Sequence, residues 1–261
     1  MGLKALLFDV DGTLADTEPQ GHLPAYNQAF AELGLNWHWD ELLYRDLLTQ
    51  PGGRERLTHY IREYQPELGK YQEEASADLA GFVNRIHAVK SRYFYERVKR
   101  GDVPLRPGVR RLMREADNAG IKVGIVTNAS AASLEPFLAY TLTDGLMDCV
   151  DAVISGEQVS RKKPAPDLYQ QALRTLQVSA SESIAIEDSA MGHDAAVGAG
   201  IPVIITLNDD TRMHDFSDAL LVVEDLGEPD IPLQVVAGDC GSHQHIDIHL
   251  LQKLVSGGIR S

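Results

Sequence analysis

The chain has 261 residues, of which 44% are hydrophobic and 24% charged, enough for one large or two modest globular domains. Its 38 acidic and 24 basic residues give a formal net charge of −14, which attracts neither phosphate backbones nor anionic lipid. We therefore expect no nucleic acid and no membrane among its partners. The chain has no long apolar run, no signal peptide and only two isolated cysteines, which predicts a cytoplasmic protein, expected to be a monomer.

A helical insertion is predicted near the start of the chain. Residues 3–8 have the pattern of a buried strand that breaks into a turn at Gly12, and the next comparable strand is 122–127. An ordinary crossover between parallel strands needs far fewer residues than this gap provides. Helical spacing of apolar residues recurs within the gap at 22–35, 41–50, 54–64 and 77–100. We therefore predict a helical cap domain at 17–104.

Strands and helices alternate after the cap. The predicted strands are 122–127, 150–155, 183–188, 202–207 and 219–223, the last of the sheet, and the predicted helices are 107–120, 167–177, 190–200 and 247–255. This alternation is typical of an α/β fold with a doubly wound, mostly parallel sheet. The predicted core domain is discontinuous and comprises 1–16 and 105–261.

Acidic residues follow two of the predicted strands. Asp9 and Asp11 stand two apart after the first strand, and residues two apart in an extended segment project from the same side. Two close carboxylates repel, so they need a cation or a shared proton. The pair Glu187 and Asp188 ends the strand 183–188. Two such clusters suggest a hard divalent metal, with Mg²⁺ favoured, although Asp9-Val10-Asp11-Gly12-Thr13 alone also fits a polar turn.

Three further motifs complete a recognisable set. They are Thr127-Asn128 after the strand 122–127, Lys163 immediately before a proline, and Glu187-Asp188. In this order, with a helical cap after the first motif, the chain resembles the haloacid dehalogenase superfamily of phosphohydrolases.

The resemblance implies a role for each matching residue. Asp9 corresponds to the nucleophile and Asp11 to the general acid and base. Thr127 corresponds to the phosphate-binding hydroxyl, with Asn128 beside it, and Lys163 to the lysine that steadies the nucleophile and the phosphoryl group. Asp9, Asp11 and Asp188 match the Mg²⁺ site, which Glu187 would reach through water. The presence of Asp11 favours phosphatases and phosphomutases, because dehalogenases of the family lack this second aspartate.

A second group of candidate residues lies in the predicted cap. Tyr44, Arg45, Gly52, Gly53 and Arg54 surround a Gly-Gly turn that opens a helix. Backbone N–H groups at such a turn can form an anion cradle, and an arginine can bind phosphate with two hydrogen bonds. The alternative is a capped helix turn with surface arginines.

Cap and core segments together are similar to one branch of the superfamily, the CbbY-type phosphatases, which share their cap class with β-phosphoglucomutase. That similarity implies xylulose-1,5-bisphosphate as the substrate, Glu18 and His22 as sugar contacts, and the Gly52-Gly53-Arg54 turn with Tyr44 and Arg45 as the site of the distal phosphate. A surface role for His22 stays open, because Pro19 and Pro24 make its segment irregular. The alternatives are a sugar phosphomutase and, in another class, an inactive scaffold that binds a protein partner.

Overall fold

The computed structural model describes residues 2–50 and 52–257, which form two units. The core unit contains the described residues up to Asp16 and from Pro104 onward, and the cap unit is Thr17–Val103. None of the helices in the described ranges is both long and apolar enough to cross a membrane.

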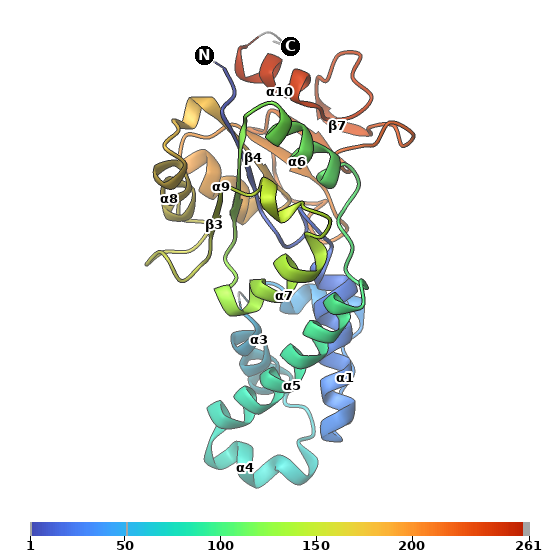
Figure 1. The fold of residues 1–261 in the computed structure, drawn as a ribbon. Coiled ribbons are helices and arrows are strands. Elements are labelled where there is room, and N and C mark those ends of the chain that lie inside the picture. The colour runs from blue at the N-terminus through green and yellow to red at the C-terminus, as the bar shows by residue number, and fades with distance from the viewer. Residues whose placement is uncertain (1, 51, 258–261) are drawn as a thin grey trace. The chain divides into compact units, whose positions relative to one another are not determined.

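The core unit is built on one seven-stranded sheet of order β3-β2-β1-β4-β5-β6-β7 (Figure 1). The strands are β1 (Ala5–Phe8), β2 (Lys122–Val126), β3 (Ala152–Ile154), β4 (Ser183–Glu187), β5 (Val203–Thr206), β6 (Leu221–Val223) and β7 (Val235–Gly238). The first six pair in parallel, and only β7 is antiparallel to its neighbour. The predicted doubly wound, mostly parallel fold is confirmed.

Helices cover both faces of the sheet, which is why its central strand β1 is apolar throughout. All four residues of β1 are buried, and Ala5 and Leu7 pack in one cluster with α8 (Asp167–Leu176) and α9 (Ala190–Gly198). The helices α6 (Val109–Asn118) and α10 (Ile248–Val255) contact each other and the opposite face (Figure 1).

The register of the central strands brings their carboxyl ends together. Phe8 at the end of β1 lies opposite Ile125 of β2 on one side and Ile186 of β4 on the other. The residues that follow these three strands therefore emerge at the same edge of the sheet, where ligands bind in open α/β folds.

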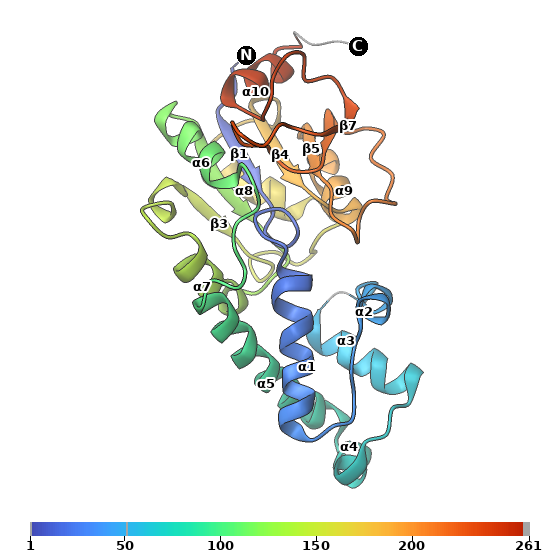
Figure 2. The ribbon, with the colours of Figure 1, turned by 90° about the vertical axis from the view of Figure 1, so that its right-hand side faces the viewer.

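The cap unit is helical and has an aromatic core. Its helices are α1 (Leu23–Leu33), α2 (Glu41–Leu47), α3 (Gly53–His59), α4 (Gln72–Ala77) and α5 (Leu79–Lys99), with π-helical turns at Glu18–His22 and Tyr60–Tyr64. Figure 2 shows α1 alongside α5, with which it packs. Trp39, Tyr26 and Phe30 are fully buried between the helices, and their ring centroids lie 4.6–6.0 Å apart.

One α-helix and one strand of the described core were not predicted. Helix α7 (Ala131–Thr141) follows β2 and contains Pro136, a residue that normally argues against a helix interior. The prediction that 219–223 is the last strand was wrong, because β7 follows it. All four residues of β7 are exposed, so the strand has no alternation of buried and exposed positions by which a sequence pattern could identify it.

Candidate active site

A buried lysine joins two carboxylates at the edge where β1, β2 and β4 end. Lys163 Nζ donates to Asp9 Oδ1 and to Glu187 Oε1, each at 2.6 Å, and to the carbonyl oxygen of Val126 at 2.7 Å. The side chains of Lys163, Asp9 and Glu187 are each at most one-tenth exposed. All three donor positions of the ammonium are thereby used, which fixes the carboxylate of Asp9 in place.

Asn128 holds the backbone of Lys163. Its Oδ1 accepts from the Lys163 N–H at 2.9 Å and its Nδ2 donates to the Lys163 carbonyl at 3.3 Å. The same Nδ2 lies 3.4 Å from Met191 Sδ. These contacts support the placement of Lys163, and a role for Asn128 in substrate binding stays a prediction.

Burial shifts the pKa values of Asp9, Asp188 and Lys163. It raises the pKa of Asp9 to about 7, an effect that Lys163 opposes and Glu187 reinforces. Burial also raises the pKa of Asp188 well above its ordinary value, with further contributions from Asp9 and Glu187. Burial alone would lower the pKa of Lys163, but Asp9 and Glu187 hold it above its usual range.

The carboxylates of Asp9, Glu187 and Asp188 form a buried group that fits a divalent cation. One oxygen from each lies within 4.8 Å of the others, and Glu187 Oε2 has no hydrogen-bond partner among the described residues. Lys163 pairs with two of the three carboxylates, Asp9 and Glu187, so a divalent cation would balance the negative charge that remains. Carboxylate oxygens are also the ligands that Mg²⁺ prefers.

Asp11 lies outside this group of three. Its side chain is partly exposed, and β1 has already ended at Phe8. The chain turns at Val10, whose carbonyl accepts from the N–H groups of Thr13 and Leu14. The rule that residues two apart share one side therefore does not apply across this turn, and a role for Asp11 as metal ligand stays a prediction.

Thr127 emerges from β2 beside this cluster. It is 1% exposed, and its N–H donates to the Ile154 carbonyl at 3.0 Å, which continues the β2–β3 pairing by one residue. Its Oγ1 accepts from the N–H of Ala129 at 3.0 Å. The hydroxyl is thus held at the same sheet edge as Asp9.

The cap unit contains a second buried polar cluster. Arg56 Nη1 donates to the Tyr44 hydroxyl at 2.6 Å, and Tyr44 in turn donates to Glu18 Oε2. The guanidinium also lies 3.5 Å from that carboxylate oxygen, and the buried Arg56 Nε has no hydrogen-bond partner in the part of the chain that the structure describes. Arg56 is 6% exposed. The Arg56 guanidinium in this cluster therefore has one N–H group, at Nε, that can still donate a hydrogen bond to a ligand.

The Gly-Gly turn lies at the start of α3 in the same unit. Gly52 has a backbone φ of 103°, which residues other than glycine rarely adopt. A Cβ on Gly53 would lie 2.7 Å from the Tyr26 hydroxyl. Both expected arginines are exposed: Arg54 donates to Asn84 at 2.8 Å, and Arg45 lies on α2. The sequence predicts Arg45 and Arg54 as phosphate-binding residues, whereas the buried arginine of this unit's polar cluster is Arg56.

His22 contacts a buried lysine. Its Nδ1 lies 2.8 Å from Lys90 Nζ, and its ring stacks on Phe94 with centroids 4.1 Å apart. Burial, then Lys90, then Arg56 lower the pKa of His22 well below its ordinary value. The lowered pKa favours the neutral imidazole, which can accept a hydrogen bond from the Lys90 ammonium, and His22 is half-buried.

The sequence analysis did not select Arg56 or Tyr169. Each lies at a position where the spacing of its apolar neighbours indicates the buried face of a helix. Arg56 precedes Tyr60 by four positions, and both face inward from successive turns that also bury Leu57. Tyr169, whose hydroxyl donates to Glu187 Oε1, lies on the buried side of α8 with Leu168 and Ala172. Both positions belong to apolar stripes, so their polar atoms must find buried partners.

Comparisons with known proteins agree with this geometry. Residues 3–200 match the family of haloacid dehalogenase-like hydrolases. The protein CbbY of Cupriavidus necator is 42% identical over 251 residues, which cover 96% of either chain. The structure of a CbbY variant from Rhodobacter sphaeroides in complex with xylulose-1,5-bisphosphate has a TM-score of 0.73 and 35% identity, and the match covers 85% of this chain and 94% of that one. A putative β-phosphoglucomutase from Thermotoga maritima has a TM-score of 0.66 and 26% identity, with the same coverage.

Proposed function

Because the chain belongs to the family of haloacid dehalogenase-like hydrolases, we propose that it is a Mg²⁺-dependent phosphatase that hydrolyses a sugar bisphosphate. The observation that carries this proposal is the buried group of Asp9, Glu187 and Asp188, in which Lys163 pairs with Asp9 and Glu187. The proposed substrate is xylulose-1,5-bisphosphate, supported by the CbbY complex with that compound. A place in carbon fixation, a cytoplasmic location and a monomeric state belong to the same proposal.

The proposed reaction has two displacements. An oxygen of Asp9 attacks phosphorus and forms an aspartyl-phosphate, while Asp11 gives its proton to the leaving alkoxide of the sugar. In the second step Asp11 takes a proton from water, whose oxygen attacks phosphorus and releases inorganic phosphate with Asp9 restored. Lys163 and the Thr127 hydroxyl face the charge that develops on the phosphoryl oxygens.

Asp9, Asp188 and Glu187 would hold the cation, the last through water, and Asp11 is the fourth expected ligand. A bound Mg²⁺ supplies positive charge next to the transferring phosphoryl group. It also favours the ionised form of Asp9, which is the form that attacks, over the protonated form that burial favours.

Phosphate release from a panel of pentulose and hexose mono- and bisphosphates tests the function. We expect pentulose bisphosphate to be hydrolysed fastest, with activity lost in excess chelator and restored by Mg²⁺. Conversion of β-glucose 1-phosphate to glucose 6-phosphate without net phosphate release would instead identify a phosphomutase. No turnover of any phosphate ester, including p-nitrophenyl phosphate, would favour an inactive scaffold.

Mg²⁺ is expected to stabilise the folded protein in the absence of substrate. A ligand at about 100 times its Kd adds about 2.7 kcal/mol to the free energy of unfolding, which corresponds to a rise in Tm of roughly 5–10 °C for a domain of this size. Calorimetry with Mg²⁺, against Na⁺ at equal ionic strength, measures this shift. The same Tm in both salts, together with full activity in chelator, would rule out the metal site.

Arg56 is expected to bind the phosphate that does not react. A charge-assisted hydrogen bond contributes about 1.5–3 kcal/mol, so Arg56→Met should lower kcat/KM for a pentulose bisphosphate roughly 10- to 100-fold. Hydrolysis of p-nitrophenyl phosphate, which has no second phosphate, should change little.

Arg54→Met and Arg45→Met are the matched controls, because both arginines are exposed in the same unit. Steady-state kinetics on both substrates, with Tm for each variant, separate binding from folding. A lower kcat/KM for the bisphosphate in Arg54→Met or Arg45→Met, with no change in Arg56→Met, would assign binding of the distal phosphate to the exposed arginines that the sequence indicates.

A further inference from the structure

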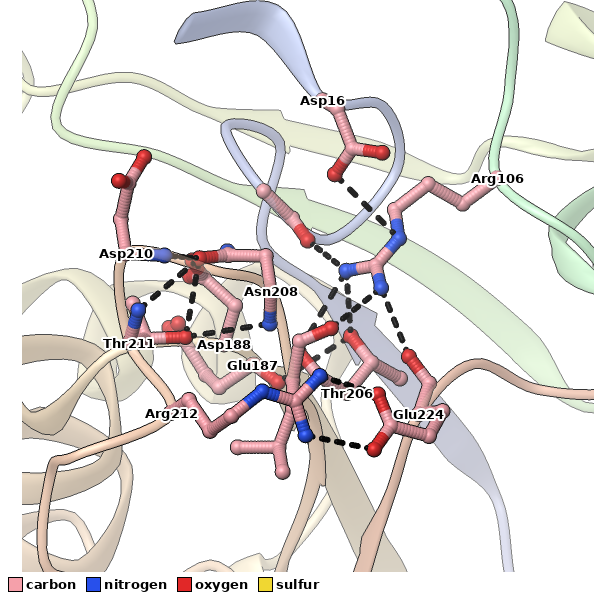
Figure 3. Close-up of polar contacts among 12 residues, drawn as sticks. Asp16, Arg106, Glu187, Asp188, Thr206, Asn208, Asp210, Thr211, Arg212 and Glu224 are labelled. Carbon is pink, nitrogen blue, oxygen red and sulfur yellow. Dashed lines mark hydrogen bonds and ion pairs between the residues drawn. The ribbon is translucent and has the colours of Figure 1, made fainter. Parts of the chain in front are cut away.

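The segment after β5 contains an asparagine whose side chain is held at both ends. Asn208 Oδ1 accepts from the N–H groups of Asp210 at 3.0 Å and Thr211 at 3.1 Å, and from the Thr211 hydroxyl at 3.1 Å (Figure 3). These three donors identify the oxygen end of the amide, because a nitrogen could not accept from them. The nitrogen end must therefore point the other way.

That nitrogen contacts the carboxylate of Asp188. Asn208 Nδ2 donates to Asp188 Oδ2 at 2.7 Å, and both side chains are drawn in Figure 3. A hydrogen bond to one oxygen fixes the rotation of a carboxylate about its Cβ–Cγ bond. Since Asn208 is itself fixed by the turn, the orientation of Asp188 is set by the backbone of another segment.

The loop that carries Asp9 and Asp11 passes directly against this pair. A Cβ on Gly12 would lie 2.2 Å from Asp188 Oδ2 and 2.7 Å from Asn208 Nδ2, so only glycine fits there. Gly12 also has a φ of 89°. The first motif, Asp188 and the segment after β5 are therefore packed in contact.

Arg106 joins two of these parts, the first motif and the segment after β5. Its guanidinium donates to the carbonyls of Gly12, Leu207 at 2.5 Å and Glu224 at 2.7 Å, and it lies 3.5 Å from Asp16 (Figure 3). Leu207 directly precedes Asn208. The amide that reaches Asp188 thus starts from a backbone anchored to the loop of the nucleophile.

We propose that Asn208 is a positioning residue that orients Asp188 to bind the divalent cation. The inference rests on the metal site of the proposed function. Asn208 lies beyond residue 200, where the family match ends. Its turn requires only the oxygen end of the amide, so the bond from Nδ2 to Asp188 has no part in making the loop.

Asn208→Ser separates the two ends of the side chain. A serine hydroxyl can accept from the same turn N–H groups, but it is too short to donate to Asp188. Loss of a group that orients a metal ligand typically costs 10- to 100-fold in metal affinity. We expect the Kd for Mg²⁺, measured by isothermal titration calorimetry without substrate, to rise by at least 10-fold, and kcat at saturating Mg²⁺ to recover most of its value.

Arg212→Ala is the matched control. Arg212 lies in the same segment, is about half exposed and pairs with Glu224 at 2.7 Å without touching Asp188. Its Mg²⁺ affinity should equal that of the wild type. If Asn208→Ser does not fold, Asn208→Thr carries the same hydroxyl and serves instead.

A folded Asn208→Ser or Asn208→Thr variant with a Kd for Mg²⁺ within twofold of the wild type would overturn the inference, whatever its Tm. A lower Tm in chelator with unchanged affinity would assign Asn208 to the loop alone. If the wild type binds no Mg²⁺, the proposed metal site fails and this inference fails with it. Binding by the wild type and equal binding by the variant would refute only the role of Asn208.

Discussion

Asp9→Asn is expected to abolish phosphate release while leaving the fold intact. Asparagine keeps the volume of the side chain and one oxygen that can accept from Lys163 Nζ, now 2.6 Å from Asp9 Oδ1, but an amide oxygen is a poor nucleophile. Turnover should fall below detection for sugar phosphates and for p-nitrophenyl phosphate alike, because both need the same displacement. Steady-state phosphate release and circular dichroism measure the two halves of this expectation.

Asp194→Asn is the matched control, because Asp194 lies on α9, the helix that follows Asp188 in the chain, and its side chain is 66% exposed. It should retain wild-type activity. Mass spectrometry of the Asp9→Asn protein excludes deamidation back to aspartate. Turnover above a few per cent in an intact Asp9→Asn sample would remove Asp9 as the nucleophile.

Lys163→Met is expected to damage both activity and stability. It leaves Asp9 and Glu187 buried without the ammonium that joins them, and breaking a buried ion pair typically costs about 3–5 kcal/mol. Because we propose that Lys163 stabilises the charge on the phosphoryl oxygens, its loss should lower kcat by roughly 10²–10³-fold. Urea unfolding and phosphate release measure the two effects.

Lys162→Met provides the control, because Lys162 is the neighbouring residue and is exposed. It should unfold at the same urea concentration as the wild type and turn over at the same rate. Equal destabilisation by the two substitutions would mean that Lys163 acts through its loop and not through the carboxylates.

The convergence of the core motifs could be predicted because it depends on sheet topology. Apolar runs and their spacing identify parallel strands, and the carboxyl ends of neighbouring parallel strands lie at one edge. Asp9, Thr127 and Asp188 follow three such runs. The structure places them after β1, β2 and β4, with β1 between the other two.

The contacts that determine the orientation and partners of each side chain could not be predicted in the same way. Asp11 follows a turn that starts at Val10, so strand periodicity no longer describes it. Arg56 lies among apolar residues on the buried face of its helix, whereas the sequence pattern favours the exposed Arg54 as the phosphate-binding arginine. The Asn208 amide donates to Asp188, which lies 20 residues away in the sequence. Such contacts depend on tertiary packing, which neither periodicity nor local propensity encodes.

The junction at Arg106 bears on how proteins of this construction diversify. The chain leaves the sheet-containing unit after Asp16 and returns at Pro104, and Arg106 pairs with Asp16 at 3.5 Å while its N–H donates to the Leu14 carbonyl at 2.9 Å. Both ends of the insertion therefore start from neighbouring points that the core itself secures. A helical insert of another length or shape can be spliced between them without altering the sheet. Substrate range can then change by exchange of the helical insert, while the proposed catalytic residues of the core unit stay the same.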